Sequence, residues 1–394
     1  MKKNIPVTAL LLLAATVFLS SHASAQAAKP YPVDLTGKKI AIFVDNQYQV
    51  GEAYYTPLRF EEAGAEVTIV SHDVPMAHRF RPNFVHYMKT DITPKEALRT
   101  KWDGAIVIGG FAPLIMREDP DIIKILQDVN SRKGMISAIC HGVCVLVTAD
   151  LIRGKNVTGN VPRSIEFTNA GATYHEIAPQ VDDNVITAIG PGDNGPYLDA
   201  MIHWFKGGEA AAKAHQNDQY LKGKKVAIVI DNRYEYSQVV YPSVRLRHNG
   251  ASVYIIANKE GEYTEYRNVL GTTKADITAQ DAINEQFDAI ILVGHYSADT
   301  YRRHADVRQL VTRQMQRGTL IASINWGHTA FIQAKIANGY SFACTWGMQN
   351  DIKNAGGTPL LKPVHRDRNL ITCASDDDLP LLMQYLVSAL VIGK

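Results

Sequence analysis

The feature that most constrains this chain is an internal repeat. The segment KKIAIFVDNQY at 38–48 returns as KKVAIVIDNRY at 224–234, a shift of 186 residues. From Trp102 onward the shift is 185, and it carries NVIT at 184–187 onto NLIT at 369–372. Repetition over this length predicts two copies of one domain.

We place the two domains at 36–206 and 223–394. The segment between them, 207–222, begins with a Gly pair and has a polar composition, which suits a linker with a helical middle. Within each copy, short runs rich in Val and Ile, such as IAIFV and GAIVIG, alternate with longer stretches of helical period. This alternation predicts an α/β fold in which helices cover both faces of a parallel sheet. In such sheets the ligand crevice lies beyond the carboxyl ends of the strands.

Residues 1–25 have the pattern of a secretory signal peptide. Lys2 and Lys3 precede the apolar run at 7–19, and Ala23 and Ala25 have the spacing that signal peptidase recognises. The alternative is a membrane anchor, although the run is too short to span a bilayer comfortably. We therefore expect a secreted protein, in the bacterial periplasm, with no membrane association after cleavage.

Composition argues against several classes of function. The formal net charge is only +2, and the basic residues are scattered among acidic ones, so we expect no nucleic acid partner. The segment GPGDNGP at 190–196 lacks the Lys-Ser/Thr of a phosphate loop, and nothing argues for a nucleotide cofactor. Four cysteines are too few for a disulfide scaffold. Cys344 and Cys373 each follow a short strand-like run and would pair only if those strands are neighbours.

The segment MISAICHGVCVLVTADL at 135–151 places Cys140 and His141 where a strand becomes a helix without a loop. A side chain on such a turn is held toward the crevice, and the helix N-terminus favours negative charge there. This setting lowers the pKa of a thiol, whose thiolate is the nucleophilic form. The alternative is a buried cysteine that packs as a small apolar residue. With Cys144, these residues would be poor metal ligands, since all three lie on one short helix start, so we expect no metal.

Three stretches of the first copy resemble the ThiJ/PfpI family, which includes parkinsonism-associated deglycase-like and PfpI peptidase-like proteins. They are DNQYQVGEAYYTPLRFEEAG at 45–64, VIGGFAP at 107–113 and AICHGVCVLVTADLIRGKNVTG at 138–159. The resemblance covers nearly the whole chain, once per copy. It implies two tandem flavodoxin-like, class I glutamine amidotransferase-like domains, with Cys140 as the nucleophile and no cofactor.

The resemblance also assigns roles to neighbouring residues. Glu52 falls on the family's glutamate that hydrogen-bonds the cysteine, and a carboxyl beside a poorly solvated thiolate is pushed toward its protonated form. The alternative for Glu52 is an acid that interacts with a helix N-terminus. His141 falls on the family's histidine and would move protons near neutral pH. Gly109 and Gly110 match a Gly-Gly turn whose amide, with that of His141, would form an oxyanion hole; the alternative is a plain tight turn.

One departure from the family concerns an acidic residue. Peptidase-like members have an acid after the Gly-Gly-x-Ala-Pro turn, where this chain has Leu114. The counterpart of Leu114 in the second copy is Asp299. We hypothesise that the copies pack as a pseudo-dimer and that Asp299 orients His141 across their interface. The alternative is that Asp299 caps a surface helix.

The second copy lacks the chemical groups of the first. Asn325 stands at the position of the nucleophile, Trp326 at that of the histidine and Gln238 at that of the glutamate, while Gly294 and His295 replace the glycine pair. We interpret this copy as a structural partner with a degenerate site. The alternative is a small ligand pocket formed by His295, Trp326 and His328.

Together these features predict a secreted enzyme with one competent site. Cys140 would attack a small electrophile such as an aldehyde or ketoaldehyde. Glyoxalase or deglycase chemistry is what the resemblance implies, and amidase, hydratase and peptidase activities remain open because the fold does not choose among them. The alternative is a redox-sensing or binding module, in which Cys140 oxidises to a sulfinate that Glu52 stabilises.

Overall fold

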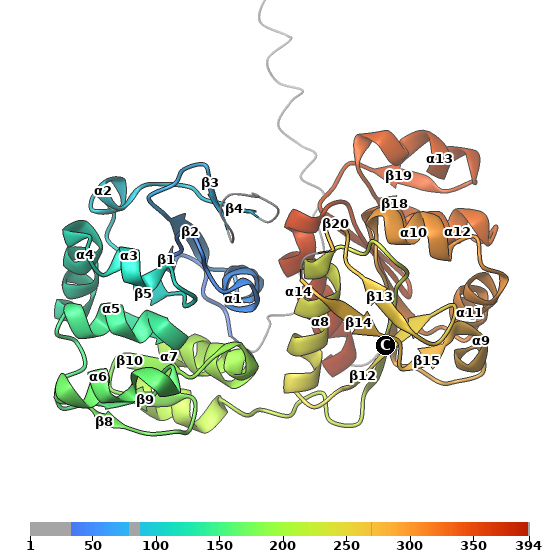
Figure 1. The fold of residues 1–394 in the computed structure, drawn as a ribbon. Helices are drawn as coiled ribbons and strands as arrows, with labels where there is room; N and C mark the ends of the chain where they lie inside the picture. The colour runs from blue at the N-terminus through green and yellow to red at the C-terminus, as the bar shows by residue number, and fades with distance from the viewer. Residues whose placement is uncertain (1–32, 79–86, 269, 393–394) are drawn as a thin grey trace, which may run out of the picture.

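The chain forms two α/β domains that lie side by side in the computed structural model (Figure 1). The structure describes residues 33–78, 87–268 and 270–392, so the predicted signal peptide at 1–25 lies outside the described residues. Among the described helices, none combines the length and the apolar character that a membrane crossing requires.

The first domain is built on a six-stranded sheet of described residues, in the order β2-β1-β5-β6-β10-β9. All pairings in it are parallel except that of β10 with β9. Its strands are β1 (Lys39–Phe43), β2 (Glu66–Val70), β5 (Gly104–Val107), β6 (Met135–Ile139), β9 (Gln180–Asp182) and β10 (Val185–Ala188). Two further sheets have two strands each: β3 (Met76–His78) pairs with β4 (Tyr87–Lys89), and β7 (Asn156–Val157) pairs with β8 (Thr173–Tyr174). The helices are α1 (Val50–Glu62), α2 (Pro94–Ala97), α3 (Pro113–Met116), α4 (Pro120–Ser131), α5 (Val143–Thr148), α6 (Ser164–Asn169) and α7 (Asn194–His215), with short 3-10 turns η1 (Cys140–Gly142), η2 (Val161–Arg163) and η3 (Pro191–Asp193).

The second domain repeats this plan on a seven-stranded sheet, in the order β15-β12-β11-β16-β17-β21-β20. Its strands are β11 (Lys225–Val229), β12 (Ser252–Ala257), β15 (Ile277–Thr278), β16 (Ala289–Leu292), β17 (Leu320–Ile324), β20 (Val364–Asp367) and β21 (Leu370–Cys373). Smaller sheets pair β13 (Glu262–Thr264) with β14 (Thr272–Lys274) and β18 (Ser341–Ala343) with β19 (Thr358–Leu360). The helices are α8 (Tyr236–His248), α9 (Ala279–Ala282), α10 (His295–Tyr301), α11 (Ala305–Gln316), α12 (Thr329–Gln333), α13 (Gln349–Asn354) and α14 (Leu379–Ile392), with 3-10 turns η4 (Asn325–His328), η5 (Trp346–Met348) and η6 (Asp376–Asp378).

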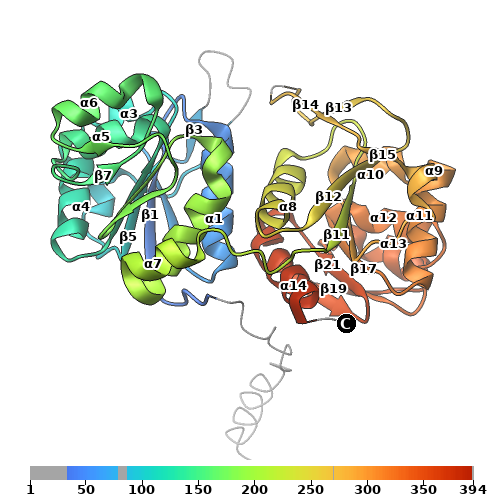
Figure 2. The same ribbon diagram turned by 90° about the horizontal axis from the view of Figure 1, so that it is seen from below.

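The predicted fold class is confirmed. Every residue of the central strands β5, β6, β16 and β17 is buried, because helices cover both faces of each sheet (Figure 2). In the first domain α1 and α7 lie on the face toward the second domain, and α3 to α6 lie on the opposite face. The carboxyl ends of the parallel strands therefore meet at one edge of each sheet, where the ligand crevice was expected.

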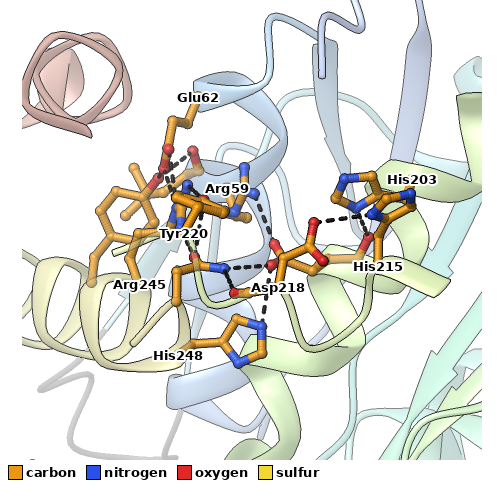
Figure 3. Close-up of polar contacts among 12 residues, drawn as sticks. Arg59, Glu62, His203, His215, Asp218, Tyr220, Arg245 and His248 are labelled. Atoms are coloured by element: carbon orange, nitrogen blue, oxygen red, sulfur yellow. Dashed lines mark hydrogen bonds and ion pairs between the residues drawn. The ribbon is translucent and has the colours of Figure 1, made fainter. Parts of the chain in front are cut away.

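The two domains pack against each other through equivalent helices, α1 and α7 of the first against α8 and α14 of the second. Tyr55 and Tyr241, which are equivalent in the repeat, meet edge to face with ring centroids 5.4 Å apart. Arg245 reaches across to Glu62 at 3.0 Å, and both side chains are almost fully buried. This contact lies in the polar network drawn in Figure 3. The two copies thus form a pseudo-dimer within one chain.

The same pseudo-twofold relation holds at the ends of the paired helices. Asp199 of α7 accepts hydrogen bonds from Asn249 at 3.0 Å and contacts His248 at 3.1 Å, both from the end of α8. Gln384 of α14, the equivalent of Asp199, donates to the backbone oxygen of Glu62 at the end of α1. The pair α1 and α7 contacts the pair α8 and α14 in the way that the second pair contacts the first. The two repeats therefore present equivalent surfaces that are complementary to each other.

Candidate functional site

The thiol of Cys140 stands at the carboxyl end of the central strand β6. Ile139 is the last extended residue, and Cys140 begins the 3-10 turn η1 with a φ of +58°, in the left-handed region that a non-glycine residue rarely adopts. Such conformations persist where the surrounding structure enforces them, often at functional sites. Here the enforcing contact is tight: a Cβ on Gly142 would lie 2.5 Å from the carbonyl oxygen of Val107, so the turn packs directly on the end of β5.

Glu52 enters the same site from the first turn of α1 and is fully buried. Its Oε2 accepts a hydrogen bond from the backbone N–H of Gly109 at 2.8 Å, while its buried Oε1 accepts none in the described structure. Burial raises the pKa of Glu52 to about 8, and the charge of Asp193 adds to the effect. At neutral pH the carboxyl is therefore mainly protonated, and a proton on Oε1 is available for the sulfur of Cys140 or for a substrate.

The helix start predicted a lowered pKa for Cys140, but the structure raises it. Burial raises it, and the negative charge of an ionised Glu52 raises it further. Hydrogen bonds from the backbone of His141 and Gly110 and from the side chain of Asn160 lower it. When Glu52 is protonated the repulsion between the two groups disappears, and only these favourable hydrogen bonds oppose the effect of burial.

The predicted oxyanion hole needs one correction. The amide of Gly109 is occupied by Glu52, so it is not free for a substrate oxygen. The amides of Gly110 and His141 are the ones directed at the sulfur, next to the position that an oxyanion would occupy. Gly110 has a φ of +88°, and a Cβ there would lie 2.4 Å from the carbonyl oxygen of Gln47. The glycine pair thus forms a tight turn and also provides the Gly110 N–H for the oxyanion hole.

His141 lies beside the nucleophile. Its Nδ1 is 3.6 Å from the Sγ of Cys140. Burial and the nearby charge of Arg163 lower the pKa of His141, so its imidazole is mainly neutral at pH 7 and can accept a proton. The ring of Phe111 lies 5.8 Å from that of His141, and the Phe111 side chain is 59% exposed, which provides an apolar wall at the mouth of the site.

Asn160 belongs to this site and was missed in the sequence. Its Nδ2 lies 3.8 Å from the Sγ of Cys140, and its backbone N–H donates to the carbonyl oxygen of Cys140 at 3.2 Å. The side-chain oxygen of Asn160 is buried with no hydrogen-bond partner in the described structure. Since Asn160 follows β7, far along the chain from the cysteine turn, no local pattern pointed to it.

The structure does not bring Asp299 to His141. Asp299 pairs with Arg302 at 2.8 Å within its own helix, α10. That helix lies on the side of the second domain away from the first, and α8 and α14 stand between them in both views (Figures 1 and 2). The copies pair through the opposite face from the one that the hypothesis required, so Asp299 is a surface residue of its helix.

The second domain keeps the shape of the site with other side chains. Asn325 has the same left-handed backbone as the cysteine it replaces, with a φ of +48°. Gln238 accepts a hydrogen bond from the N–H of Gly294, as Glu52 does from Gly109. His328 is not part of a pocket, because it is fully buried between the hydroxyl of Ser323 and a backbone oxygen.

All four cysteines are free thiols. Cys344 and Cys373 do not pair, although β18 lies against β21 and the N–H of Ala343 donates to the hydroxyl of Thr372 at 2.8 Å. Cys144 is buried and its Sγ lies 3.5 Å from Glu166, and burial raises its pKa to about 12. Cys140 is therefore the more accessible of the two thiols of the first domain, since it is only partly buried.

Comparisons with known proteins identify relatives of this chain. The chain is 31% identical over 157 residues to a putative cysteine protease of Bacillus subtilis, YraA, and 30% identical over 158 residues to protein/nucleic acid deglycase 2 of Escherichia coli. Each match covers 40% of this chain and 91% of the relative. Protein DJ-1 homolog D of Arabidopsis thaliana is 22% identical over 365 residues, which cover 87% of this chain and 91% of that protein. The model of the DJ-1/PfpI family matches twice, at residues 38–203 and 224–389, and the chain therefore belongs to the DJ-1/PfpI family as a tandem of two domains.

Proposed function

We propose that the first domain is a cofactor-independent cysteine enzyme that acts on small carbonyl compounds, with deglycase-type or glyoxalase-type chemistry. The observation that carries the proposal is the pairing of Cys140 with a buried carboxyl, Glu52, whose pKa of about 8 keeps it protonated at neutral pH. A thiol nucleophile, a proton donor and two amides then meet at one point. The similarity to a relative named as a deglycase supports the same class of reaction.

In this proposal the sulfur of Cys140 attacks the aldehyde carbon while its proton passes to His141. The S–C bond forms as the C=O π electrons move to oxygen, where the amides of Gly110 and His141 stabilise the charge. Protonation of that oxygen by His141 or Glu52 completes a hemithioacetal. For a ketoaldehyde, a proton shift to the adjacent carbon gives a thioester, and hydrolysis releases a hydroxy acid and the thiol.

Consumption of methylglyoxal by the mature chain tests this function. Repeated turnover that is abolished in Cys140→Ser, and kept in the matched variant Cys144→Ser, is expected. A protein that instead gains the mass of two oxygen atoms on Cys140 under mild peroxide, and consumes no methylglyoxal, amide or peptide substrate, is a redox sensor, and the enzymatic proposal would then be wrong.

We also propose that only the first domain is catalytic and that the protein is exported to the periplasm. The second domain has Asn325 at the position of the nucleophile, and an amide cannot act as a thiolate does. Export is supported by the pattern of residues 1–25 alone. Mass spectrometry of the protein from a periplasmic extract should give a mature chain that begins at Gln26, and an uncleaved chain in the cytoplasmic fraction would refute export.

A further inference from the structure

Three side chains with metal-ligating atoms meet in the second domain, at the place where the first domain has its cysteine site. The ligand atoms of Glu235, His295 and Asp376 all lie within 4.8 Å of one another. His295 Nε2 is 3.2 Å from the Oδ2 of Asp376. The three residues follow the carboxyl ends of β11, β16 and β21, so they occupy the crevice edge of the sheet.

The internal repeat shows that this group is specific to the second domain. The positions equivalent to Glu235, His295 and Asp376 in the first domain hold Gln49, Gly110 and Pro191. The second domain has therefore lost the cysteine chemistry and has, in the same crevice, one imidazole and two carboxylates that the first domain lacks. These three replacements bring one imidazole and two carboxylates to one point of the crevice.

The backbone at His295 supports this view. His295 has a φ of +57°, and its counterpart in the first domain is a glycine in the same region of backbone conformation. Glycine adopts that conformation without strain, whereas a histidine does not. The second domain therefore carries its imidazole on the backbone conformation that the first domain gives to a glycine.

The surroundings of the three residues have the features of a ligand site. The side-chain oxygen of Asn325 is buried with no hydrogen-bond partner in the described structure, and Asn325 lies against Gly294, the residue before His295. Gln238 donates a hydrogen bond to Asp376 and holds its carboxylate, as outer-shell partners of metal ligands do. The His295 and Asp376 side chains are 30% and 28% exposed, which leaves a path from solvent.

Aromatic rings form one wall of this crevice. Trp326 and Tyr296 meet with ring centroids 5.8 Å apart, and Tyr266 stacks on Tyr296 at 5.1 Å. The ring of His295 lies 5.7 Å from that of Tyr266. These rings limit how far the imidazole can turn, so its Nε2 stays on the side of the two carboxylates.

We propose that the second domain binds a divalent transition-metal ion through Glu235, His295 and Asp376. A set of one imidazole and two carboxylates suits borderline cations such as Zn²⁺ and Mn²⁺, rather than soft Cu⁺ or an all-oxygen Ca²⁺ site. Three protein ligands leave a coordination position open for water or for an anionic group. The proposal is independent of the chemistry at Cys140, and it departs from the expectation of no metal drawn from Cys140, His141 and Cys144.

A second group of residues must be separated from this site in any experiment. His203, His215 and Asp218 also bring their ligand atoms within 4.8 Å of one another, near the linker (Figure 3). The two imidazole rings of that group stack, with planes 22° apart, and His215 already contacts Asp218 at 3.0 Å. This group lies on α7 and the segment after it, not at the carboxyl ends of the sheet strands, and we use it as a control.

The test is a titration of the chelator-treated mature chain with Zn²⁺, by calorimetry, in a Cys140→Ser background that removes the reactive thiol. One equivalent of Zn²⁺ is expected to bind. His295→Gly, which restores the residue of the first domain and relieves the strained backbone, and Asp376→Asn should each weaken binding by about tenfold or more. The matched control His215→Gln should leave binding unchanged.

Co²⁺ absorption provides a second readout, because the d–d bands of Co²⁺ shift and intensify when the ion leaves its octahedral hydration shell for a protein site of lower coordination number. The spectrum should appear in the Cys140→Ser protein and be lost in His295→Gly, while circular dichroism shows that the variant is folded. If the chain binds no Zn²⁺ or Co²⁺, or if both His295→Gly and Asp376→Asn bind with unchanged affinity, the proposal is wrong. Methylglyoxal turnover by the protein with an intact Cys140 is measured separately, so either proposal can fail alone.

Discussion

The substitution Glu52→Gln tests whether the folded protein holds this carboxyl in its protonated form. Burial raises the pKa of Glu52 from an ordinary value of 4.5 to about 8. Between these two pH values the folded state keeps a proton that the unfolded chain has lost. The stabilising contribution is therefore fully present below pH 4.5 and is lost as the pH rises toward 8. At about 1.4 kcal/mol for each pH unit, the loss between pH 4.5 and pH 7 is about 3 kcal/mol.

Glutamine cannot ionise, so Glu52→Gln should avoid this loss. The variant is expected to be more stable than the natural protein by up to about 3 kcal/mol at pH 7, and to have almost no advantage near pH 4.5. The repeat shows that glutamine fits this environment, since Gln238 makes the equivalent contact to Gly294 in the second domain. The matched substitution Gln238→Glu should destabilise the second domain at pH 7, because it places a carboxyl beside Asp376.

Urea unfolding at several pH values between 5 and 8 measures these effects, and buried thiols report on each domain separately. Cys144 and Cys373 are both fully buried, so their labelling by a thiol reagent follows the opening of the first and second domains. We expect that Glu52→Gln raises the free energy of unfolding by an amount that grows with pH. Labelling of Cys144 in the first domain should show this increase, and labelling of Cys373 in the second domain should not. A gain that is absent, or that is equal at pH 5 and pH 8, would show that Glu52 is ionised in the folded protein and would remove the proton donor from the mechanism.

Three further substitutions test other parts of the structure. Asn160→Ala removes a donor from the sulfur, and should slow labelling of Cys140 by iodoacetamide at pH 7 severalfold while far-UV circular dichroism stays unchanged; equal rates would exclude Asn160 from the site. Burial raises the pKa of Glu62 to about 7, so above that pH Glu62→Gln leaves the buried guanidinium of Arg245 without its ionic partner. The substitution should lower the free energy of unfolding by about 3 kcal/mol in urea at pH 8, whereas a change below 1 kcal/mol would contradict the interface described above. Asp299→Ala should leave turnover and its pH profile unaltered, because Asp299 pairs within its own helix; a shifted profile would restore the interdomain hypothesis.

The fold and most of the cysteine site could be predicted from the sequence because their signals are local. The repeat and the apolar runs of the buried strands predicted two parallel sheets. The change from strand to helix at Cys140 predicted that the nucleophile lies at the crevice. Glu52 and Gly110 were found through the resemblance of short motifs, and they do lie at the sulfur. These features depend on residues close together in the chain or on strand order, which periodicity reveals.

Contacts between residues that lie far apart in the sequence were decided by the tertiary structure alone. Burial, which no single motif reports, raises the pKa of both Glu52 and Cys140 and assigns the amide of Gly109 to the carboxyl instead of to substrate. The packing of α1 against α8 and α14 turned α10 outward, and so separated Asp299 from the site that the alignment of the copies had suggested. The sequence by itself determined two domains of one fold and a single cysteine turn. Which side chains share the site with that cysteine, and which converge in the second crevice, depended on long-range packing, because contacts between distant segments leave no periodic signal in the chain.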